Sequence, residues 1–103
     1  FLDRVFTPLE ISYFKSRNDN ACHIAGTFAA KEAVLKALGT GLRGIEWKDI
    51  EIKRDVSGKP AVFLYKNAAL AAESAGIKNI HISISHSRDY ALAQAIAEGE
   101  RVK

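Results

Sequence analysis

A long helical pattern at residues 21–38 constrains the fold more than any other feature of this sequence. On a wheel of 3.6 residues per turn, one stripe of this helix carries four apolar residues, Ile24, Phe28, Leu35 and Leu38. Lys31 falls in the middle of that stripe. Because an apolar stripe packs against a core, the Lys31 ammonium must either extend to solvent or meet a counter-charge. Gly39 follows as the cap that ends the helix.

Two shorter helices are predicted by their start and stop signals. Thr7 as N-cap, with Glu10 three residues later, forms a capping box and predicts a helix over residues 8–15. The alanine-rich residues 67–75, which end at Gly76, predict another.

The remaining segments have the pattern of two β-hairpins. Isoleucines alternate with polar residues at 49–53, the turn SGKP follows at 57–60, and residues 61–65 form the return strand. Residues 79–87 alternate in the same way and lead through a turn into a strand over 90–97. This order predicts an α+β fold in which helices pack on one face of an antiparallel sheet. The alanine-rich face of the last strand could pack beneath the helices or against another copy.

Length and composition limit the class of protein. The 103 residues, 48% hydrophobic and 26% charged, suit one compact domain over residues 1–103. The apolar stretches are far shorter than the ~20 residues that span a bilayer, and the first ten residues lack the layout of a signal peptide. A single cysteine, Cys22, excludes an internal disulfide framework, so we expect a soluble cytoplasmic protein. The net charge of +3 favours an anionic partner such as a phosphate ester, an acidic protein or nucleic acid.

Glu32 and Lys36 lie four residues apart on the long helix, beside Lys31. One interpretation is a surface ion pair next to a lysine whose stem covers apolar surface, and the helical pattern by itself favours it. The other is a phosphoryl-transfer site, in which the Glu32 carboxylate binds Mg²⁺ and the lysines bind phosphate.

A second candidate is His86-Ser87, which lies where a predicted strand ends and is followed by Arg88. His86 faces the same way as the core isoleucines but at the strand end, so it is either a structural histidine or a side chain in a cleft. The spacing of the three histidines does not suggest a zinc site. The glycine-rich loop at 39–44 and the turn at 57–60 match no phosphate-binding fingerprint and are interpreted first as connections.

Three segments together resemble the holo-(acyl-carrier-protein) synthase family of 4'-phosphopantetheinyl transferases: FAAKEAVLKALGTG at 28–41, SGKP at 57–60 and HISISHS at 81–87. Their order and spacing match over nearly the whole chain, and the F-x-x-K-E-A-x-x-K string is the specific part. The resemblance implies an enzyme that moves 4'-phosphopantetheine from coenzyme A to a serine of apo-acyl carrier protein, releasing adenosine 3',5'-bisphosphate, with Mg²⁺ as cofactor. It also implies a homotrimer with active sites between subunits, and no nucleic-acid or membrane partner.

Carried over residue by residue, the resemblance assigns roles to particular positions. Glu32 would bind the metal and, with Lys36 near the transferring phosphate, carry out catalysis. The coenzyme A site would be lined by Lys31, Lys36, Gly39, Gly58, Lys59, Pro60, His86 and Ser87. The last pair would come from across a subunit interface. Basic side chains near the N-terminus would dock the acidic carrier protein: Arg4, Lys15 and Arg17.

The sequence departs from the family pattern in two places. Members begin with a strand carrying a G-x-D motif whose aspartate is a second metal ligand, whereas this chain opens inside the following helix, with Asp3 as its only early acid. We expect either that this strand is missing from the given sequence or that the chain is a degenerate member without catalysis. The arginine that often precedes the F-x-x-K-E string and touches coenzyme A phosphates is Thr27 here. A small basic nucleic-acid-binding module is the alternative from another class, although no RNP-like or GXXG element is present.

Overall fold

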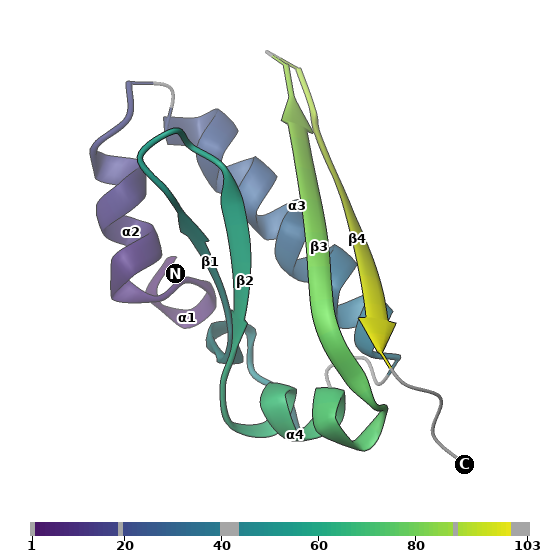
Figure 1. Cartoon of the computed structure of the whole chain (residues 1–103). Coiled ribbons are helices and arrows are strands. Elements are labelled where there is room, and N and C mark those ends of the chain that lie inside the picture. Colours follow the sequence, from purple (N-terminus) through teal and green to yellow (C-terminus); the bar gives the residue numbers. More distant parts are fainter. Residues whose placement is uncertain (1, 19, 40–43, 88, 100–103) are drawn as a thin grey trace.

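The computed structural model describes residues 2–18, 20–39, 44–87 and 89–99. Figure 1 shows its elements, which in chain order are the helices and strands α1 (Leu2–Val5), α2 (Pro8–Lys15), α3 (Asn20–Leu38), the 3-10 helix η1 (Trp47–Asp49), β1 (Ile50–Arg54), β2 (Pro60–Leu64), α4 (Lys66–Ser74), β3 (Ile77–His86) and β4 (Ala91–Gly99).

The strands form two antiparallel hairpins, β1 with β2 and β3 with β4. In the first, Ile50 pairs with Leu64 and Arg54 with Pro60, and in the second His86 pairs with Ala91. The hairpins stand side by side with α3 behind them, while α1 and α2 flank β1 (Figure 1). The α+β class is confirmed, and the sheet is present as two separately hydrogen-bonded pairs within the described part of the chain.

The predicted helices form close to their expected bounds because their capping signals are local. The Thr7 hydroxyl accepts from the Glu10 N–H at 3.3 Å, and the Glu10 carboxylate accepts from the Thr7 N–H at 2.9 Å, which is the predicted capping box. Gly39 ends α3 with φ +78°, a conformation that favours glycine. Among the described residues, no helix has both the length and the hydropathy of a membrane-spanning segment. Residues 40–43 of the glycine-rich loop lie outside the described part.

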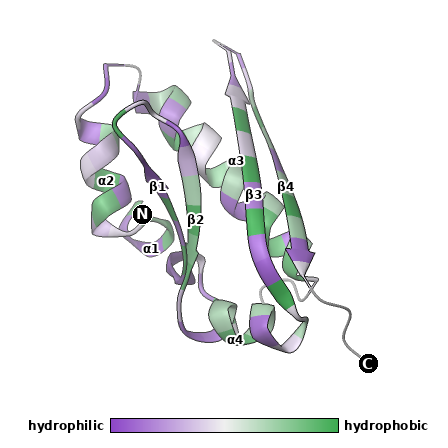
Figure 2. Ribbon diagram, viewed as in Figure 1, coloured by the Kyte–Doolittle hydropathy of each residue, from purple (hydrophilic) through white to green (hydrophobic). Residues whose placement is uncertain are grey.

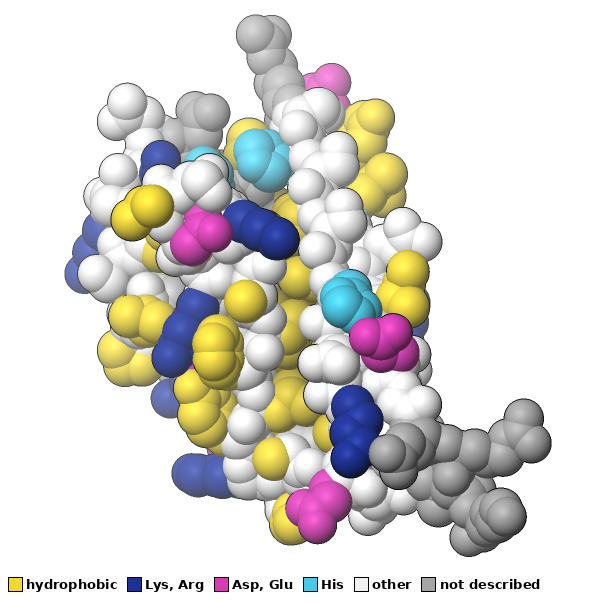
Figure 3. Space-filling model, viewed as in Figure 1, with side chains coloured by type: hydrophobic (Ala, Val, Ile, Leu, Met, Phe, Trp, Pro, Cys, Tyr) yellow, Lys and Arg dark blue, Asp and Glu magenta, His cyan; other side chains and the backbone are white. Residues whose placement is uncertain are grey.

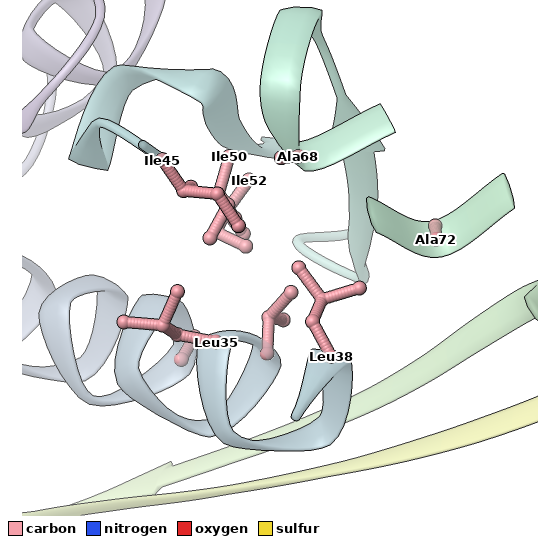
Figure 4. Close-up of a cluster of buried hydrophobic side chains, with 9 residues drawn as sticks. Leu35, Leu38, Ile45, Ile50, Ile52, Ala68 and Ala72 are labelled. Carbon is pink, nitrogen blue, oxygen red and sulfur yellow. The ribbon is translucent and has the colours of Figure 1, made fainter. Parts of the chain in front are cut away.

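The hydrophobic core lies where α3, β1 and α4 meet (Figure 4). Its buried members are Ala30, Val34, Leu35, Leu38, Ile45, Ile50, Ile52, Ala68 and Ala72. A second cluster, built from Val5, Phe6 and Phe14, packs against Ile24 and Phe28 at the other end of α3. The predicted apolar stripe of the long helix therefore serves both clusters.

The second hairpin also has the predicted alternation, visible as bands of green and purple along its strands in Figure 2. Ile80, Ile82 and Ile84 pack on the core, and so do Ala93 and Ala95 of β4. Ala93 and Ala95 of the alanine-rich face of β4 thus pack beneath the chain's own helix, which was the first of the two expected arrangements. The outer face of β4 instead exposes Leu92 and Ile96, at 62% and 58% of their surface.

Two features differ from the sequence expectation. The alternation at residues 49–53 gave no sign that its acidic members would be buried, yet Glu51 is 7% exposed and Asp49 5% exposed. Glu51 is buried because Thr7 and Tyr65 cover it, with hydrogen bonds of 2.6 Å and 3.0 Å to its carboxylate. The short helices α1 and η1 were not predicted.

Asp55 fixes the turn between β1 and β2. Its Oδ1 accepts from the Ser57 hydroxyl at 2.6 Å and from the N–H groups of Ser57 and Lys59, each at 2.9 Å. The Ser57 hydroxyl bond, followed by the Lys59 backbone bond, holds the pKa of Asp55 below its ordinary value of 3.8. Gly58, at φ +90°, allows the chain to turn here.

Asp55→Asn should destabilise the hairpin at neutral pH because the charged acceptor of the turn is lost. A lowered pKa means that the wild-type carboxylate contributes stability above pH 3.8, and that this contribution disappears as pH falls through the lowered pKa of the folded state. Urea midpoints of the two proteins should therefore differ at pH 7 and converge below pH 3.8. A constant difference at all pH values would contradict this role for the charge.

Candidate active site

The middle of α3 presents adjacent residues to opposite environments. Successive residues of an α-helix differ by about 100° around the axis. Lys31 therefore points into the protein, where it is 0% exposed, while Glu32 lies on the solvent side. Lys36, one turn after Glu32, is also exposed, as expected for two residues on the same face of the helix.

The Lys31 ammonium contacts four oxygen atoms, each from a different element. It donates to the carbonyls of Val5 in α1, Trp47 in η1 and Ile50 in β1, at 2.9, 3.0 and 2.7 Å. It also forms an ion pair with Glu10 Oε1 of α2 at 2.8 Å. Of the two outcomes expected for a cation in an apolar stripe, the counter-charge is the one observed.

Glu10 completes this interior network. Besides Lys31, its Oε1 accepts from the Thr7 N–H, and its Oε2 accepts from the Ile52 N–H at 2.8 Å. Burial lowers the pKa of Lys31 from its ordinary value of 10.5, and the Glu10 carboxylate opposes that change. With no exposed atom, Lys31 is held as a structural cation, and this geometry does not support the expected contact between Lys31 and coenzyme A.

A polar hollow of about 330 Å³ lies beside the N-terminal half of α3 and receives part of the predicted coenzyme A site. It is lined by Tyr13, Arg17, His23, Arg54, Ser57, Gly58, Pro60, Ile84 and His86. Figure 3 shows His and Lys or Arg side chains close together near the end of the molecule where the β1–β2 turn lies. His86 is thus a side chain in a cleft, and its ring lies 5.2 Å from that of His23.

Gly26 brings β3 close enough to α3 to form this hollow. A Cβ atom at this buried position would lie 3.0 Å from Ile84 Cγ2 and 3.7 Å from His86 Cδ2. A contact of 3.0 Å is tighter than most real Cβ contacts, so glycine lets the end of β3 rest on the helix. The position of His86 therefore depends on the absence of a side chain at position 26.

The predicted site residues separate into two groups along α3. Gly58, Pro60 and His86 line the hollow, with Lys59 and Ser87 adjacent to them in sequence and exposed. The other group is Glu32, Lys36 and Gly39. From Gly26, Glu32 lies about 9 Å along the helix and about 120° around it. A single chain therefore does not present both groups on one face of α3. Arg88 lies outside the described residues.

The hollow also contains residues that sequence reasoning did not assign to coenzyme A. They include Tyr13, Arg17, His23 and Arg54, contributed by α2, the loop after it, α3 and β1. Arg54 donates to the Thr27 hydroxyl at 3.0 Å. A guanidinium therefore lies beside position 27, where the sequence itself has threonine. In the sequence, the only signal for a role of Arg54 was its position at the end of a predicted strand, beside a turn.

The comparisons identify the family. The model of the 4'-phosphopantetheinyl transferase superfamily matches residues 1–95. The chain belongs to this superfamily. It is 50% identical over 103 residues to the holo-(acyl-carrier-protein) synthase of Clostridium kluyveri, an alignment that covers 100% of this chain and 77% of that protein.

Two further relatives support this membership of the phosphopantetheinyl transferases. Identity to the holo-(acyl-carrier-protein) synthase of Alkaliphilus oremlandii is 55% over 97 residues, covering 94% of this chain and 80% of that protein. The crystal structure of the Helicobacter pylori holo-(acyl-carrier-protein) synthase in complex with coenzyme A has a TM-score of 0.81 and 33% sequence identity. That likeness covers 95% of this chain and 81% of the other.

The donor set available to a metal is small. Within residues 2–18, 20–39, 44–87 and 89–99, no group of three or more His, Cys, Asp or Glu side chains could hold a metal ion. Mg²⁺ is commonly bound by one or two carboxylates together with water and substrate phosphates, and not by a cage of protein ligands. The single exposed carboxylate of Glu32 therefore fits an ion that arrives with a diphosphate substrate.

Lys31→Met should destabilise this phosphopantetheinyl transferase fold by about 3–5 kcal/mol, because it leaves the Glu10 carboxylate buried and unpaired. Urea unfolding measures the loss. Lys36→Met, on the exposed side of the same helix, is the control and should change stability by less than about 0.5 kcal/mol. Adding Glu10→Leu to Lys31→Met should recover part of the loss. Equal effects at positions 31 and 36 would contradict the structural role of Lys31.

Proposed function

We propose that this chain transfers 4'-phosphopantetheine from coenzyme A to a serine of apo-acyl carrier protein. The products are holo-acyl carrier protein and adenosine 3',5'-bisphosphate. The observation that carries the proposal is the exposed pair Glu32 and Lys36 on α3, in a chain about 50% identical to holo-(acyl-carrier-protein) synthases. The family match also leaves the nucleic-acid-binding alternative without support.

The chemistry needs negative charge to be neutralised on the diphosphate while a serine hydroxyl attacks its β-phosphorus. Glu32 is the residue that would hold Mg²⁺, and the ion would neutralise charge on the diphosphate oxygens. Glu32 could equally orient a water molecule that accepts the serine proton. Lys36 lies one helical turn away and would stabilise the charge that develops on the departing bisphosphate.

The polar hollow is the proposed location of coenzyme A binding. Gly58, Pro60 and His86 line it, and Lys59 and Ser87 lie at exposed positions next to them. Gly39 is exposed directly after the end of α3. It follows Lys36 by three residues and belongs to the same surface region. Lys31 is omitted from the proposed coenzyme A contacts because its ammonium is enclosed by four protein oxygens.

We propose that the complete active site is assembled from two copies of the chain within a homotrimer. Glu32 and Lys36 of one copy would meet the hollow of its neighbour, because the two groups face different directions around α3. The exposed Leu92 and Ile96 on the outer face of β4 provide an apolar surface for such an assembly. A cytoplasmic location is part of the proposal and fits the single cysteine of the chain.

Glu32→Gln should lower turnover by about a hundredfold or more, because it keeps the size of the side chain and removes its charge. Mass spectrometry of the carrier protein measures the reaction as the gain of the phosphopantetheine arm. Glu73→Gln, at an exposed position on α4, is the matched control and should leave turnover unchanged. Undiminished turnover in Glu32→Gln would remove Glu32 from the mechanism. Absent turnover in the wild type, with the fold intact, would identify a degenerate member.

Mixing two inactive variants should restore activity if the site is shared. The Glu32→Gln and His86→Ala variants are refolded together, which gives mixed trimers. In each mixed trimer, one interface combines the intact Glu32 of one chain with the intact His86 of the other. Random assembly predicts recovery of about a quarter of wild-type activity. The double variant, mixed with either single variant, is the control and should recover nothing. No recovery in the first mixture would mean that each chain forms its own site.

A further inference from the structure

Arg54 is held in one orientation inside the polar hollow. Its Nη2 donates to the Thr27 hydroxyl at 3.0 Å, and its Nη1 donates to the Tyr13 hydroxyl at 3.4 Å. Its guanidinium carbon also lies 4.7 Å from the centroid of the Tyr13 ring. Thr27 is 2% exposed, so the hydroxyl that orients the guanidinium is itself fixed by the helix. The fork of a guanidinium has further N–H donors that these two bonds do not use.

The surroundings of Arg54 are rich in groups that carry or can accept positive charge. The Arg17 guanidinium carbon lies 4.9 Å from the same Tyr13 ring, and the rings of His23 and His86 are in contact nearby. None of the described residues that line the hollow is Asp or Glu. The neighbouring Asp55 uses its Oδ1 within its own turn.

Positively charged groups that lie close together in a concave site attract an anion, and the bound anion offsets their mutual repulsion. A phosphate group suits this arrangement, because a fixed guanidinium can donate two parallel N–H bonds to its oxygens. Arg54 is the arginine whose donors are oriented by two protein hydroxyls, so it loses little side-chain freedom on binding. The hollow also contains Gly58, Pro60 and His86, which are the proposed coenzyme A contacts.

We propose that Arg54 binds a phosphate group of coenzyme A, and that Thr27 and Tyr13 act as positioning residues for its guanidinium. This inference rests on the proposed function, because it takes coenzyme A as the ligand of the hollow. The group bound by Arg54 is either the 3'-phosphate or the diphosphate of coenzyme A. Both present the same oxygens to Arg54, and the two are separated by the choice of ligand.

The test is calorimetric titration of the purified full chain with coenzyme A and with 3'-dephospho-coenzyme A. Arg54→Gln should weaken coenzyme A binding by about tenfold to a hundredfold, as expected for a lost hydrogen bond to a charged group. If the 3'-phosphate is bound, the affinity for the dephospho form should not change. If the diphosphate is bound, both affinities should fall together. Equal affinities of wild type and Arg54→Gln for both ligands would overturn the inference.

Three further variants separate ligand binding from a structural effect. Arg54→Lys keeps the charge but not the fork, so it should recover only part of the affinity. Thr27→Val removes the orienting hydroxyl at nearly constant size, and coenzyme A affinity should fall by less than in Arg54→Gln, with the thermal midpoint measured in parallel. Lys53→Gln is the control. This substitution also removes one positive charge, but outside the hollow, because the Lys53 ammonium lies over the Phe63 ring. A loss in Lys53→Gln as large as in Arg54→Gln would contradict a specific contact.

The result is distinguishable from failure of the proposed function. Binding is measured without the carrier protein. If the wild-type chain binds coenzyme A but shows no turnover, the affinities of wild type and Arg54→Gln still test the role of Arg54. A chain that turns over normally while Arg54→Gln binds both ligands like wild type would overturn only the role of Arg54. Failure of the wild type to bind coenzyme A would overturn both.

Discussion

The ion pair between Lys31 and Glu10 is the interaction on which the rest of the structure depends. Burying two charges costs several kcal/mol for each ion, and that cost is offset only when the remaining donors and acceptors are satisfied. Here three carbonyls and two backbone N–H groups complete the pair. The partners come from α1, α2, η1 and β1, so the pair fixes the position of α3 relative to four other elements.

Fixing α3 also fixes the chemistry on its surface. Glu32 follows Lys31 directly, so the inward direction of the ammonium determines the outward direction of the carboxylate. Lys36 follows one turn later, and Gly26 sets the distance to the end of β3, where His86 lies. One rigid helix therefore positions the proposed catalytic pair and one wall of the hollow, and leaves them facing different directions.

Much of the fold could be predicted because its signals are local. The capping box of α2, the apolar stripe of α3 and the alternation in β3 each depend on neighbouring residues, and all three are confirmed. The partner of Lys31 could not be predicted, because Glu10 and the three carbonyls are distant in sequence. Arg54 was missed for the same reason: its role depends on α2 and α3 meeting the end of β1. The helices α1 and η1 are too short to carry a periodic signal.

The bond from the Ile52 N–H to Glu10 Oε2 has a consequence for how copies of the chain can associate. An outer strand with unpaired backbone groups is a template for adding a foreign strand, and natural proteins block such edges. On β1 a carboxylate from α2 occupies this donor on the side away from β2. Sheet extension through β1 is thereby obstructed, which protects the hairpin from edge-to-edge aggregation and leaves self-association to other parts of the surface.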